Sequence, residues 1–258
     1  MIQADTKVNG IIPVLGFGTW KITGERCAES VKDAIDLGYR HIDTAQLYDN
    51  ELFVGKGIAM SKTDRVNIFL TTKISSGNLE PSRIKKSTFE SLKKLNTDYV
   101  DLLLIHWPFP GINIRACLET MFELLQSGHT RYVGVSNFTP GLFVQSFEAG
   151  PVINNQVKFS PLHTEFGNLK IAKEHKKIIT AYSPLEQGRI SKENVLTQIG
   201  EKYQKTAAQV TLRWLIQLGN MAVIPKAGDE KHRRENYDIF DFELTQEDIE
   251  LINGLSNL

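Results

Sequence analysis

The sequence is poor in cysteine and carries no excess of charge of either sign. Among its 258 residues there are two cysteines, and 30 lysine and arginine residues balance 30 aspartate and glutamate residues. We expect Cys27 and Cys117 to be reduced packing residues of predicted helices in a reducing compartment, not a disulfide. Because the net charge is zero, no global field favours nucleic acid or an anionic membrane.

Long hydrophobic runs are also missing. The first residues, Met1–Lys7, contain no apolar run, which argues against a signal peptide. No stretch is long and apolar enough to span a bilayer. We therefore expect a cytoplasmic protein without a membrane partner. With no heptads and no excess apolar stripe, a monomer is the expected state.

Two further signatures are absent. The six histidines are scattered, without H-x-H or H-E-x-x-H, so no metal site is expected and a metal-dependent barrel hydrolase or isomerase is disfavoured. No G-x-G-x-x-G follows an early strand, since Gly16-Phe17-Gly18 is only part of that pattern. This disfavours a doubly wound sheet, the alternative fold for a chain of this kind.

What the sequence does contain is an alternation of apolar strand-like runs with amphipathic helical patterns. Runs such as Leu102–Ile105 are apolar on both faces, as a buried parallel sheet requires. Eight such units predict an α/β fold, a (β/α)₈ TIM barrel, in one domain over residues 1–258. An N-terminal β-hairpin with Asn9-Gly10 as its turn precedes the barrel and can plug its bottom. The predicted strands are Val14–Phe17, Arg40–Asp43, Ile68–Lys73, Val100–His106, Tyr132–Ser136, Ile153–Lys158, Ile178–Tyr182 and Ala222–Pro225, and the predicted helices include Cys27–Leu37, Ser82–Leu95, Ala116–Leu125, Leu169–Lys176, Ala207–Leu218 and one near Gln246–Leu255.

Polar side chains stand where predicted strands end. Asp43, Lys73 and His106 each close a strand, and Tyr48 follows Asp43 by five residues at a helix start. Barrel enzymes keep their chemistry at this rim. Each residue alone could be a helix cap, a solvated charge, a packing residue or a hydrogen-bonded core histidine. Four of them on one barrel face are better explained as a catalytic group.

The segment from Gly38 to Glu51 resembles the hallmark of the aldo-keto reductase family, G-x-R-x-x-D-T-A-x-x-Y-x-N-E. The matching residues are Gly38, Arg40, Asp43, Thr44, Ala45, Tyr48, Asn50 and Glu51. The resemblance extends from about Val8 to Asn236 and is to a short, prokaryotic-type member. It implies an oxidoreductase that transfers a hydride from a nicotinamide cofactor to the carbonyl of an aldehyde or ketone. In that reaction Tyr48 would donate the proton, Lys73 would lower the Tyr48 pKa, Asp43 would hold Lys73, and His106 would orient the carbonyl.

The resemblance also implies a cofactor groove at successive strand ends. Gly18-Thr19-Trp20 is similar to the family's G-T-W/Y opening. Further segments match the family's G-V-S-N-F at Gly134–Phe138, N-Q at Asn155-Gln156 and Y-S-P-L at Tyr182–Leu185. Thr19 would line the cofactor and Tyr182 would stack on the nicotinamide. The nicotinamide carboxamide would be held by Ser136, Asn137 and Gln156. The residues expected to bind the cofactor are Gly18, Thr19, Trp20, Asp43, Ser136, Asn137, Gln156, Tyr182, Ser183, Leu185, Lys226, Ala227, His232, Glu235 and Asn236.

Two departures from the family pattern bear on the choice of cofactor. Ala227 stands where a hydroxyl is usual, and His232 where an arginine usually contacts the adenine and the 2′-phosphate. A guanidinium is always charged, whereas histidine is only partly charged at neutral pH. Lys226 can still meet a phosphate, with Lys231, Arg233 and Arg234 near in the sequence. NADPH is therefore favoured, and NADH is the alternative.

The substrate pocket is expected to be open. Trp20, Tyr48, His106 and Trp107 would line it, and Ile74-Ser75 stands where many relatives carry a bulky tryptophan. The rim is also short after His106 and at the C-terminal end. We expect broad tolerance of aldehydes. The alternative is a non-catalytic nicotinamide-binding sensor, similar to the family's potassium-channel β subunits; the intact set of four polar residues favours the enzyme.

Overall fold

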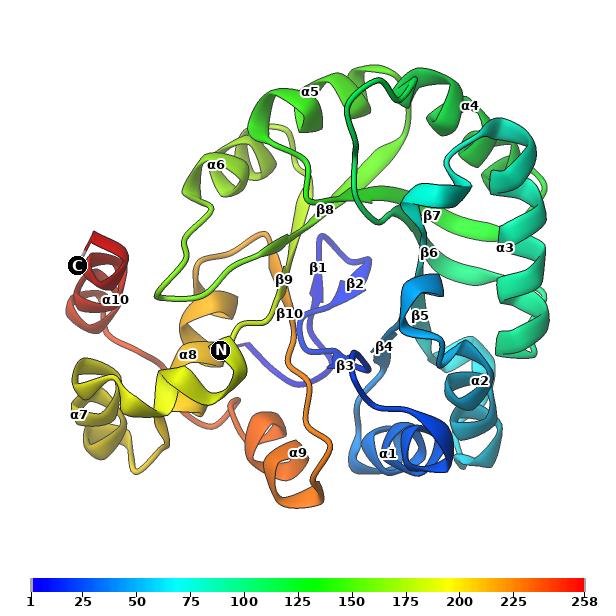
Figure 1. Cartoon of the computed structure of the whole chain (residues 1–258). Helices are drawn as coiled ribbons and strands as arrows, with labels where there is room; N and C mark the ends of the chain where they lie inside the picture. The colour runs from blue at the N-terminus through cyan, green and yellow to red at the C-terminus, as the bar shows by residue number, and fades with distance from the viewer. Residues whose placement is uncertain (1, 258) are drawn as a thin grey trace.

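The computed structural model describes residues 2–257, and its centre is a parallel sheet curled into a barrel (Figure 1). Every strand of this eight-stranded sheet pairs in parallel with its neighbour in the sequence. The strands are β3 (Phe17–Gly18), β4 (His41–Asp43), β5 (Phe69–Ile74), β6 (Val100–Ile105), β7 (Thr130–Ser136), β8 (Val152–Lys158), β9 (Ile178–Tyr182) and β10 (Met221–Ile224). The predicted TIM barrel is thus confirmed.

Backbone hydrogen bonds between the first and last strands close the barrel. The amide of Gly16 donates to the carbonyl of Val223 (2.8 Å), and the amide of Val223 donates to the carbonyl of Val14 (2.8 Å). The predicted first strand, Val14–Phe17, is shifted: β3 begins only at Phe17, because the preceding residues meet β10 through an isolated bridge from Leu15. The other predicted strands agree with the structure to within two residues at each end.

An antiparallel hairpin precedes the barrel, as the sequence predicts. It consists of β1 (Lys7–Val8) and β2 (Ile12–Pro13), with Asn9 and Gly10 at φ of 51° and 72° in the turn. A positive φ at both positions is what the Asn-Gly dipeptide supplies at low cost. In Figure 1 the hairpin lies in the middle of the ring of strands, and Ile12 is fully buried.

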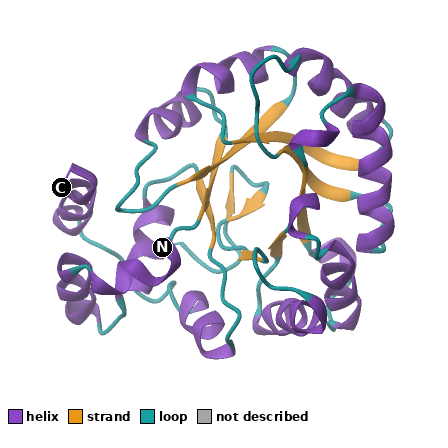
Figure 2. Cartoon of the chain, viewed as in Figure 1, coloured by secondary structure: helices purple, strands orange, loops and turns teal. Residues whose placement is uncertain are grey.

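Helices surround the strands as an outer layer (Figure 2). Their ends carry ordinary capping chemistry: Pro81 opens α3, Asn96 ends it in the left-handed conformation, and Thr206 with Gln209 forms a capping box at α8. The α-helices are α1 (Gly24–Leu37), α2 (Glu51–Met60), α3 (Pro81–Leu95), α4 (Ile114–Gln126), α5 (Pro140–Glu148), α6 (Phe166–Glu174), α7 (Asn194–Tyr203), α8 (Ala207–Gln217), α9 (Glu230–Tyr237) and α10 (Gln246–Asn253). Short 3₁₀ turns are η1 (Gln46–Tyr48), η2 (Arg65–Asn67), η3 (Ser76–Asn78), η4 (Glu186–Lys192) and η5 (Gly254–Asn257).

The turn from α1 into β4 depends on Gly38. Its φ is +125°, and a Cβ there would collide with the hydroxyl of Tyr237. Only glycine tolerates both constraints. Arg40 then braces the turn, since its Nη1 donates to the carbonyls of Ile35 and Tyr39 at 2.8 Å each. Two hallmark residues therefore act structurally, by delivering β4 to the barrel.

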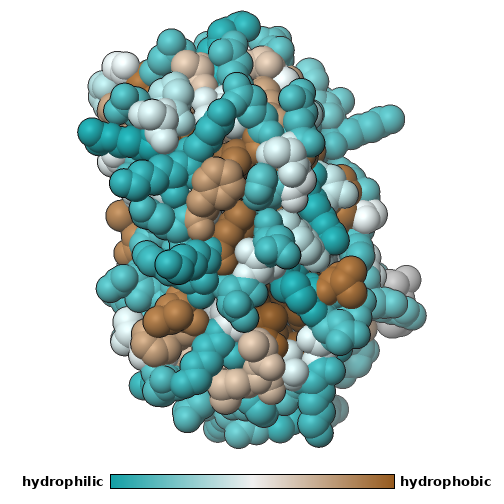
Figure 3. Space-filling model, turned by 90° about the vertical axis from the view of Figure 1, so that its right-hand side faces the viewer, coloured by the Kyte–Doolittle hydropathy of each residue, from teal (hydrophilic) through white to brown (hydrophobic). Residues whose placement is uncertain are grey.

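The face of the molecule shown in Figure 3 is mainly hydrophilic. Figure 3 shows the side of the molecule that carries α2 and α3 in Figure 1, where separate hydrophobic patches are scattered among polar side chains. Leu52 and Phe89 are among the exposed apolar residues of these helices. Cys27 and Cys117 are buried free thiols. Within residues 2–257, no helix has the length and apolar character needed to cross a membrane.

A histidine lies inside the barrel. His41 on β4 is fully buried, its Nε2 lies 3.1 Å from the hydroxyl of Thr71, and its Nδ1 has no partner among the described residues. Burial lowers the pKa of His41 to about 4. The imidazole is therefore neutral in the folded protein, whereas an unfolded chain would protonate it below a pKa of about 6.5.

This histidine should make the protein acid-labile. The folded pKa is depressed, so stability that is present above about pH 6.5 is lost as the pH falls toward 4. Between pH 7 and pH 5 we expect a loss of about 2 kcal/mol from this group in urea unfolding. His41→Gln should remove that part of the pH dependence, and His163→Gln, an exposed control, should not. A ring titration of His41 near pH 6.5 in the folded protein would contradict the prediction.

Candidate active site

The turn after β4 is held by one buried amide. Asn50 accepts a hydrogen bond from Thr44 Oγ1 (2.6 Å), and its Nδ2 donates to the carbonyls of Thr19 and Ile22 at 2.9 Å each. Asn50 is fully buried, so these bonds are shielded from water. It thereby ties the loop after β3 to the turn η1, which presents Tyr48.

A buried ion pair lies beneath this turn. Lys73 on β5 is fully buried, and its Nζ lies 2.6 Å from Asp43 Oδ1 and 2.8 Å from the carbonyl of Thr44. Burial opposes the charged ammonium, but Asp43 and Tyr48 outweigh it and raise the pKa of Lys73. The same Nζ lies 3.4 Å from the hydroxyl of Tyr48. The ammonium is thus fixed between a carboxylate and a phenol.

Asp43 serves two partners. Its Oδ1 pairs with Lys73, and its Oδ2 accepts a hydrogen bond from Gln156 Nε2 at 2.7 Å. Gln156 comes from β8, across the barrel from β4. One carboxylate therefore links the ammonium to an amide on a distant strand.

The phenol of Tyr48 is neutral at neutral pH. Burial raises its pKa above the usual value, Lys73 opposes that rise, and Asp43 adds to it. The sequence predicts that the Lys73 ammonium lowers the Tyr48 pKa. The ammonium does act in that direction, but burial has the larger effect on the pKa. A neutral phenol is the form that can donate a proton.

His106 faces the same space. It follows β6, and its ring packs edge-on against Tyr48, with 5.7 Å between ring centroids and an angle of 76° between the planes. Burial, followed by the charge of Lys73, lowers the pKa of His106 to about 3. Its imidazole is therefore neutral and carries one N–H donor. Its Nδ1 has no partner among the residues that the structure describes.

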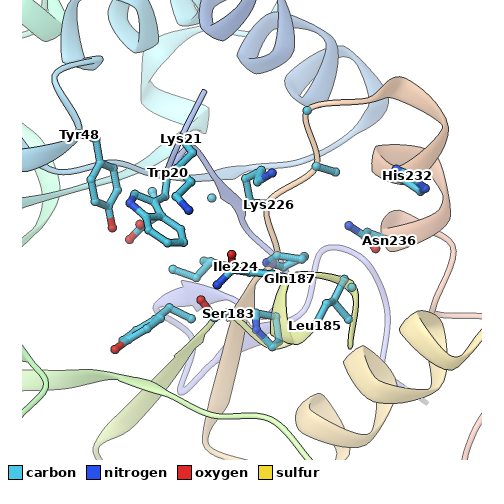
Figure 4. Close-up of a pocket in the computed structure, with 18 of the residues that line it drawn as sticks. Trp20, Lys21, Tyr48, Ser183, Leu185, Gln187, Ile224, Lys226, His232 and Asn236 are labelled. Atoms are coloured by element: carbon cyan, nitrogen blue, oxygen red, sulfur yellow. The ribbon is translucent and has the colours of Figure 1, made fainter. Parts of the chain in front are cut away.

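These groups open into a cavity of about 1000 Å³ at the carboxyl ends of the strands. In Figure 4, Tyr48 and Trp20 lie at one side of this cavity and His232 and Asn236 at the other, with Lys226 between them. The predicted residues that line it are Gly18, Trp20, Asp43, Tyr48, His106, Trp107, Ser136, Asn137, Gln156, Tyr182, Ser183, Leu185, Lys226, Ala227, His232, Glu235 and Asn236.

Two predicted residues do not line the cavity. Lys73 is buried behind Asp43 and Tyr48, as its ion pair requires. Thr19 is also fully buried, and its hydroxyl donates to the carbonyl of Asp43 at 3.0 Å. In the structure, Thr19 therefore braces β4 instead of facing the cavity.

The wall between the two ends is built from amides and a tyrosine. Tyr182 donates its hydroxyl hydrogen to Asn137 Oδ1 (2.9 Å), and Asn137 Nδ2 donates to the carbonyl of His106 (3.0 Å). Asn137 is thus occupied by protein partners and is held at a φ of +61°. Gln156 donates its side-chain N–H to Asp43. Its side-chain oxygen Oε1 accepts no hydrogen bond within residues 2–257, so it is available to a ligand.

A constrained loop after β9 forms another wall. Ser183, Glu186 and Gln187 all have positive φ, at 50°, 47° and 55°. The buried carboxylate of Glu186 anchors the loop, since it accepts from the Ser160 hydroxyl at 2.7 Å and lies 3.0 Å from Lys158 Nζ. Gln187 lines the cavity, and the sequence offered no distinctive signal for it.

The two arginines that follow His232 in the sequence bind other side chains instead of lining the cavity. Arg233 is buried and pairs with Asp33 (3.0 Å), and Arg234 pairs with Glu230 (2.8 Å). Neither lines the cavity. Arg26 in the first turn of α1 lines it instead, and its Nη2 donates to the carbonyl of Gly228 at 3.1 Å. A cation in a first helical turn, where acidic residues are favoured, is the sequence signal that could have found it.

Side chains that bind metals do not gather anywhere in the part of the chain that the structure describes. No group of three or more histidine, cysteine, aspartate or glutamate residues within residues 2–257 could hold a metal ion. The reactive groups of this site are a phenol, an ammonium–carboxylate pair and a neutral imidazole, which lie at one end of the cavity.

Comparison with known proteins agrees with this arrangement. Residues 14–257 match the model of the Aldo/keto reductase family. The sequence is 41% identical over 230 residues to methylglyoxal reductase DkgB of Salmonella typhimurium, covering 87% of this chain and 84% of that protein. It is 38% identical to the DkgB of Escherichia coli O157:H7, covering 95% and 93%. The crystal structure of an aldo/keto reductase from Brucella melitensis superposes with a TM-score of 0.90 at 38% identity, covering 99% of each chain. The chain therefore belongs to the aldo/keto reductase family and is an NAD(P)H-dependent oxidoreductase.

Proposed function

We propose that this protein reduces the carbonyl group of small aldehydes and ketones to alcohols, with NADPH as the favoured cofactor and NADH as a second one. The observation that carries the proposal is the buried Asp43–Lys73 pair, which holds its ammonium 3.4 Å from a phenol that faces the cavity. Relatives named methylglyoxal reductase support small aldehydes as the substrate class.

The cavity fits a nicotinamide dinucleotide. Its volume of about 1000 Å³ lies at the upper end of the usual range for ligand sites, about 300–1000 Å³. At the Tyr48 end, the ring of Tyr182 offers an apolar face and Gln156 a free carbonyl oxygen for a carboxamide. Farther from Tyr48, Lys226 offers a cation for the phosphates.

When bound, the cofactor would supply a hydride to the carbonyl carbon. Negative charge then grows on the carbonyl oxygen, and Tyr48 would donate its proton there. The Lys73 ammonium would stabilise the phenolate that Tyr48 leaves behind, and Asp43 keeps Lys73 charged. His106 would donate its single N–H to the same oxygen and orient the substrate.

The substrate end is open and apolar. Trp20 is 38% exposed, Trp107 is 46% exposed and Leu47 is 60% exposed, and all three line the cavity. Leu47 was not expected from the sequence; it precedes Tyr48 on η1, so it projects beside the phenol. These side chains would contact the substrate through apolar area alone, which favours tolerance over tight binding.

The proposal is tested by the loss of nicotinamide absorbance with a panel of aldehydes that includes methylglyoxal, run separately with NADPH and NADH. We expect consumption of NADPH with several aldehydes and slower consumption of NADH. If the protein binds either cofactor but consumes neither with any aldehyde, the reductase proposal fails, and a non-catalytic nicotinamide-binding sensor takes its place.

A further inference from the structure

We propose that Arg26 and Asp229 set the discrimination between NADPH and NADH, Arg26 by attracting the adenosine 2′-phosphate and Asp229 by repelling it. This inference rests on the proposed function, since it assumes that the cavity holds a nicotinamide dinucleotide. Both residues line the cavity: Arg26 contacts Gly228, and Asp229 caps the start of α9. This helix carries His232, which lies away from Tyr48 in Figure 4. Neither is among the residues that the sequence predicts to bind the cofactor.

Arg26 offers an available guanidinium at this end. It projects from α1, and its Nη2 reaches across to the carbonyl of Gly228 at 3.1 Å. Among residues 2–257, Arg26 makes no ion pair, so its charge is not neutralised by a carboxylate. A guanidinium presents five N–H donors, and one bond to a carbonyl leaves donors for a phosphate.

The other nearby arginines cannot take this role. Arg233 is buried and bound to Asp33 and to the carbonyl of Ala227, and Arg234 is bound to Glu230 on the surface of α9. Lys226 lines the cavity and adds a second cation. The charge for the 2′-phosphate would thus come from Arg26 on α1, together with Lys226, and not from α9, where His232 lies.

Asp229 acts against a phosphate at the same place. Its Oδ1 accepts hydrogen bonds from the backbone amides of Lys231 (2.9 Å) and His232 (3.4 Å) at the start of α9. A helix start offers such amides to bound anions, and here the carboxylate of the chain already occupies them. A second anion beside Asp229 would be repelled. With attraction and repulsion opposed, we expect the wild type to prefer NADPH only weakly.

Two variants with opposite expected effects test this inference. Arg26→Ala should weaken NADPH binding by up to about fivefold and leave NADH binding unchanged, as expected for one lost charge contact at an exposed site. Asp229→Asn should strengthen NADPH binding several-fold without changing NADH binding, because asparagine keeps the helix cap and removes the charge. Lys231→Ala is the matched control, since Lys231 is an exposed cation of α9 that does not line the cavity.

Dissociation constants are read from the quenching of tryptophan fluorescence, without any carbonyl substrate. Adenosine 2′,5′-bisphosphate and adenosine 5′-monophosphate differ only in the 2′-phosphate. Each variant should change the ratio of their dissociation constants as it changes the ratio for NADPH and NADH. Equal changes for both dinucleotides, no change in either variant, or an equal effect of Lys231→Ala would overturn the inference. If the wild type binds both cofactors but reduces no aldehyde, the proposed function fails, and the binding ratios still decide on Arg26 and Asp229.

Discussion

Tyr48→Phe is expected to abolish turnover while leaving cofactor binding largely intact. The substitution removes the phenolic hydroxyl that lies 3.4 Å from the Lys73 ammonium and leaves the ring that packs against His106. Loss of a general acid costs typically 10²–10⁴ in rate, so kcat should fall by about a thousandfold or more. The measurement is steady-state reduction of methylglyoxal together with a fluorescence titration of NADPH.

Tyr182→Phe is the matched control for this experiment. It removes a second hydroxyl from the same cavity, one whose hydrogen bond goes to Asn137 and not to an ammonium. Its kcat should fall far less than that of Tyr48→Phe. If Tyr48→Phe loses cofactor binding and turnover to the same extent, Tyr48 is not the proton donor.

Asp43→Asn is expected to have a large effect on stability as well as on activity. It leaves the ammonium of Lys73, which is fully buried, without its carboxylate. Breaking a buried pair on one side costs about 3–5 kcal/mol, because the remaining charge is uncompensated. The free energy of unfolding in urea measures this loss, and turnover should fall too, since Lys73 then loses the group that keeps it charged.

The double variant Asp43→Asn/Lys73→Met separates the two effects. It removes both charges, so most of the lost stability should return while turnover stays low. A surface comparison is Glu25→Gln, which breaks the exposed pair with Lys56, whose side chain is 49% exposed, and should cost much less. If the double variant is as unstable as Asp43→Asn, or if Asp43→Asn costs less than about 1 kcal/mol, the ion pair does not have the assigned weight.

The fold could be predicted because its signals are local and repeated. Runs that are apolar on both faces, such as Leu102–Ile105, are typical of buried parallel strands, and their regular alternation with helical patterns favours a barrel. The positions of Asp43, Lys73 and His106 followed from the same logic, since each closes a strand. The first strand was misplaced because its pairing with β10 depends on how the barrel closes, which is not a local property.

Other features depend on where side chains point in three dimensions. Arg233 and Arg234 are near His232 in the sequence but are engaged by Asp33 and Glu230, whereas Arg26, about two hundred residues away, lines the cavity. The pKa of Tyr48 likewise depends on the extent of its burial, which the presence of Lys73 in the sequence does not reveal. The position of a residue relative to its strand predicts the end of the barrel at which it lies. The side chains that it contacts depend on the packing of the folded chain.

The shared carboxylate of Asp43 has a consequence for how such an enzyme can change. Its two oxygens bind Lys73 and Gln156 separately, one on the side where Tyr48 would donate its proton and one on the wall that would face the carboxamide. A substitution at Gln156 that alters cofactor affinity would also free one oxygen of Asp43 and thereby shift the charge around Lys73. We therefore expect substitutions at the base of the cavity to change cofactor affinity and proton donation at the same time. Substitutions at the exposed rim, at Leu47 or Trp107, can change the substrate preference without this coupling.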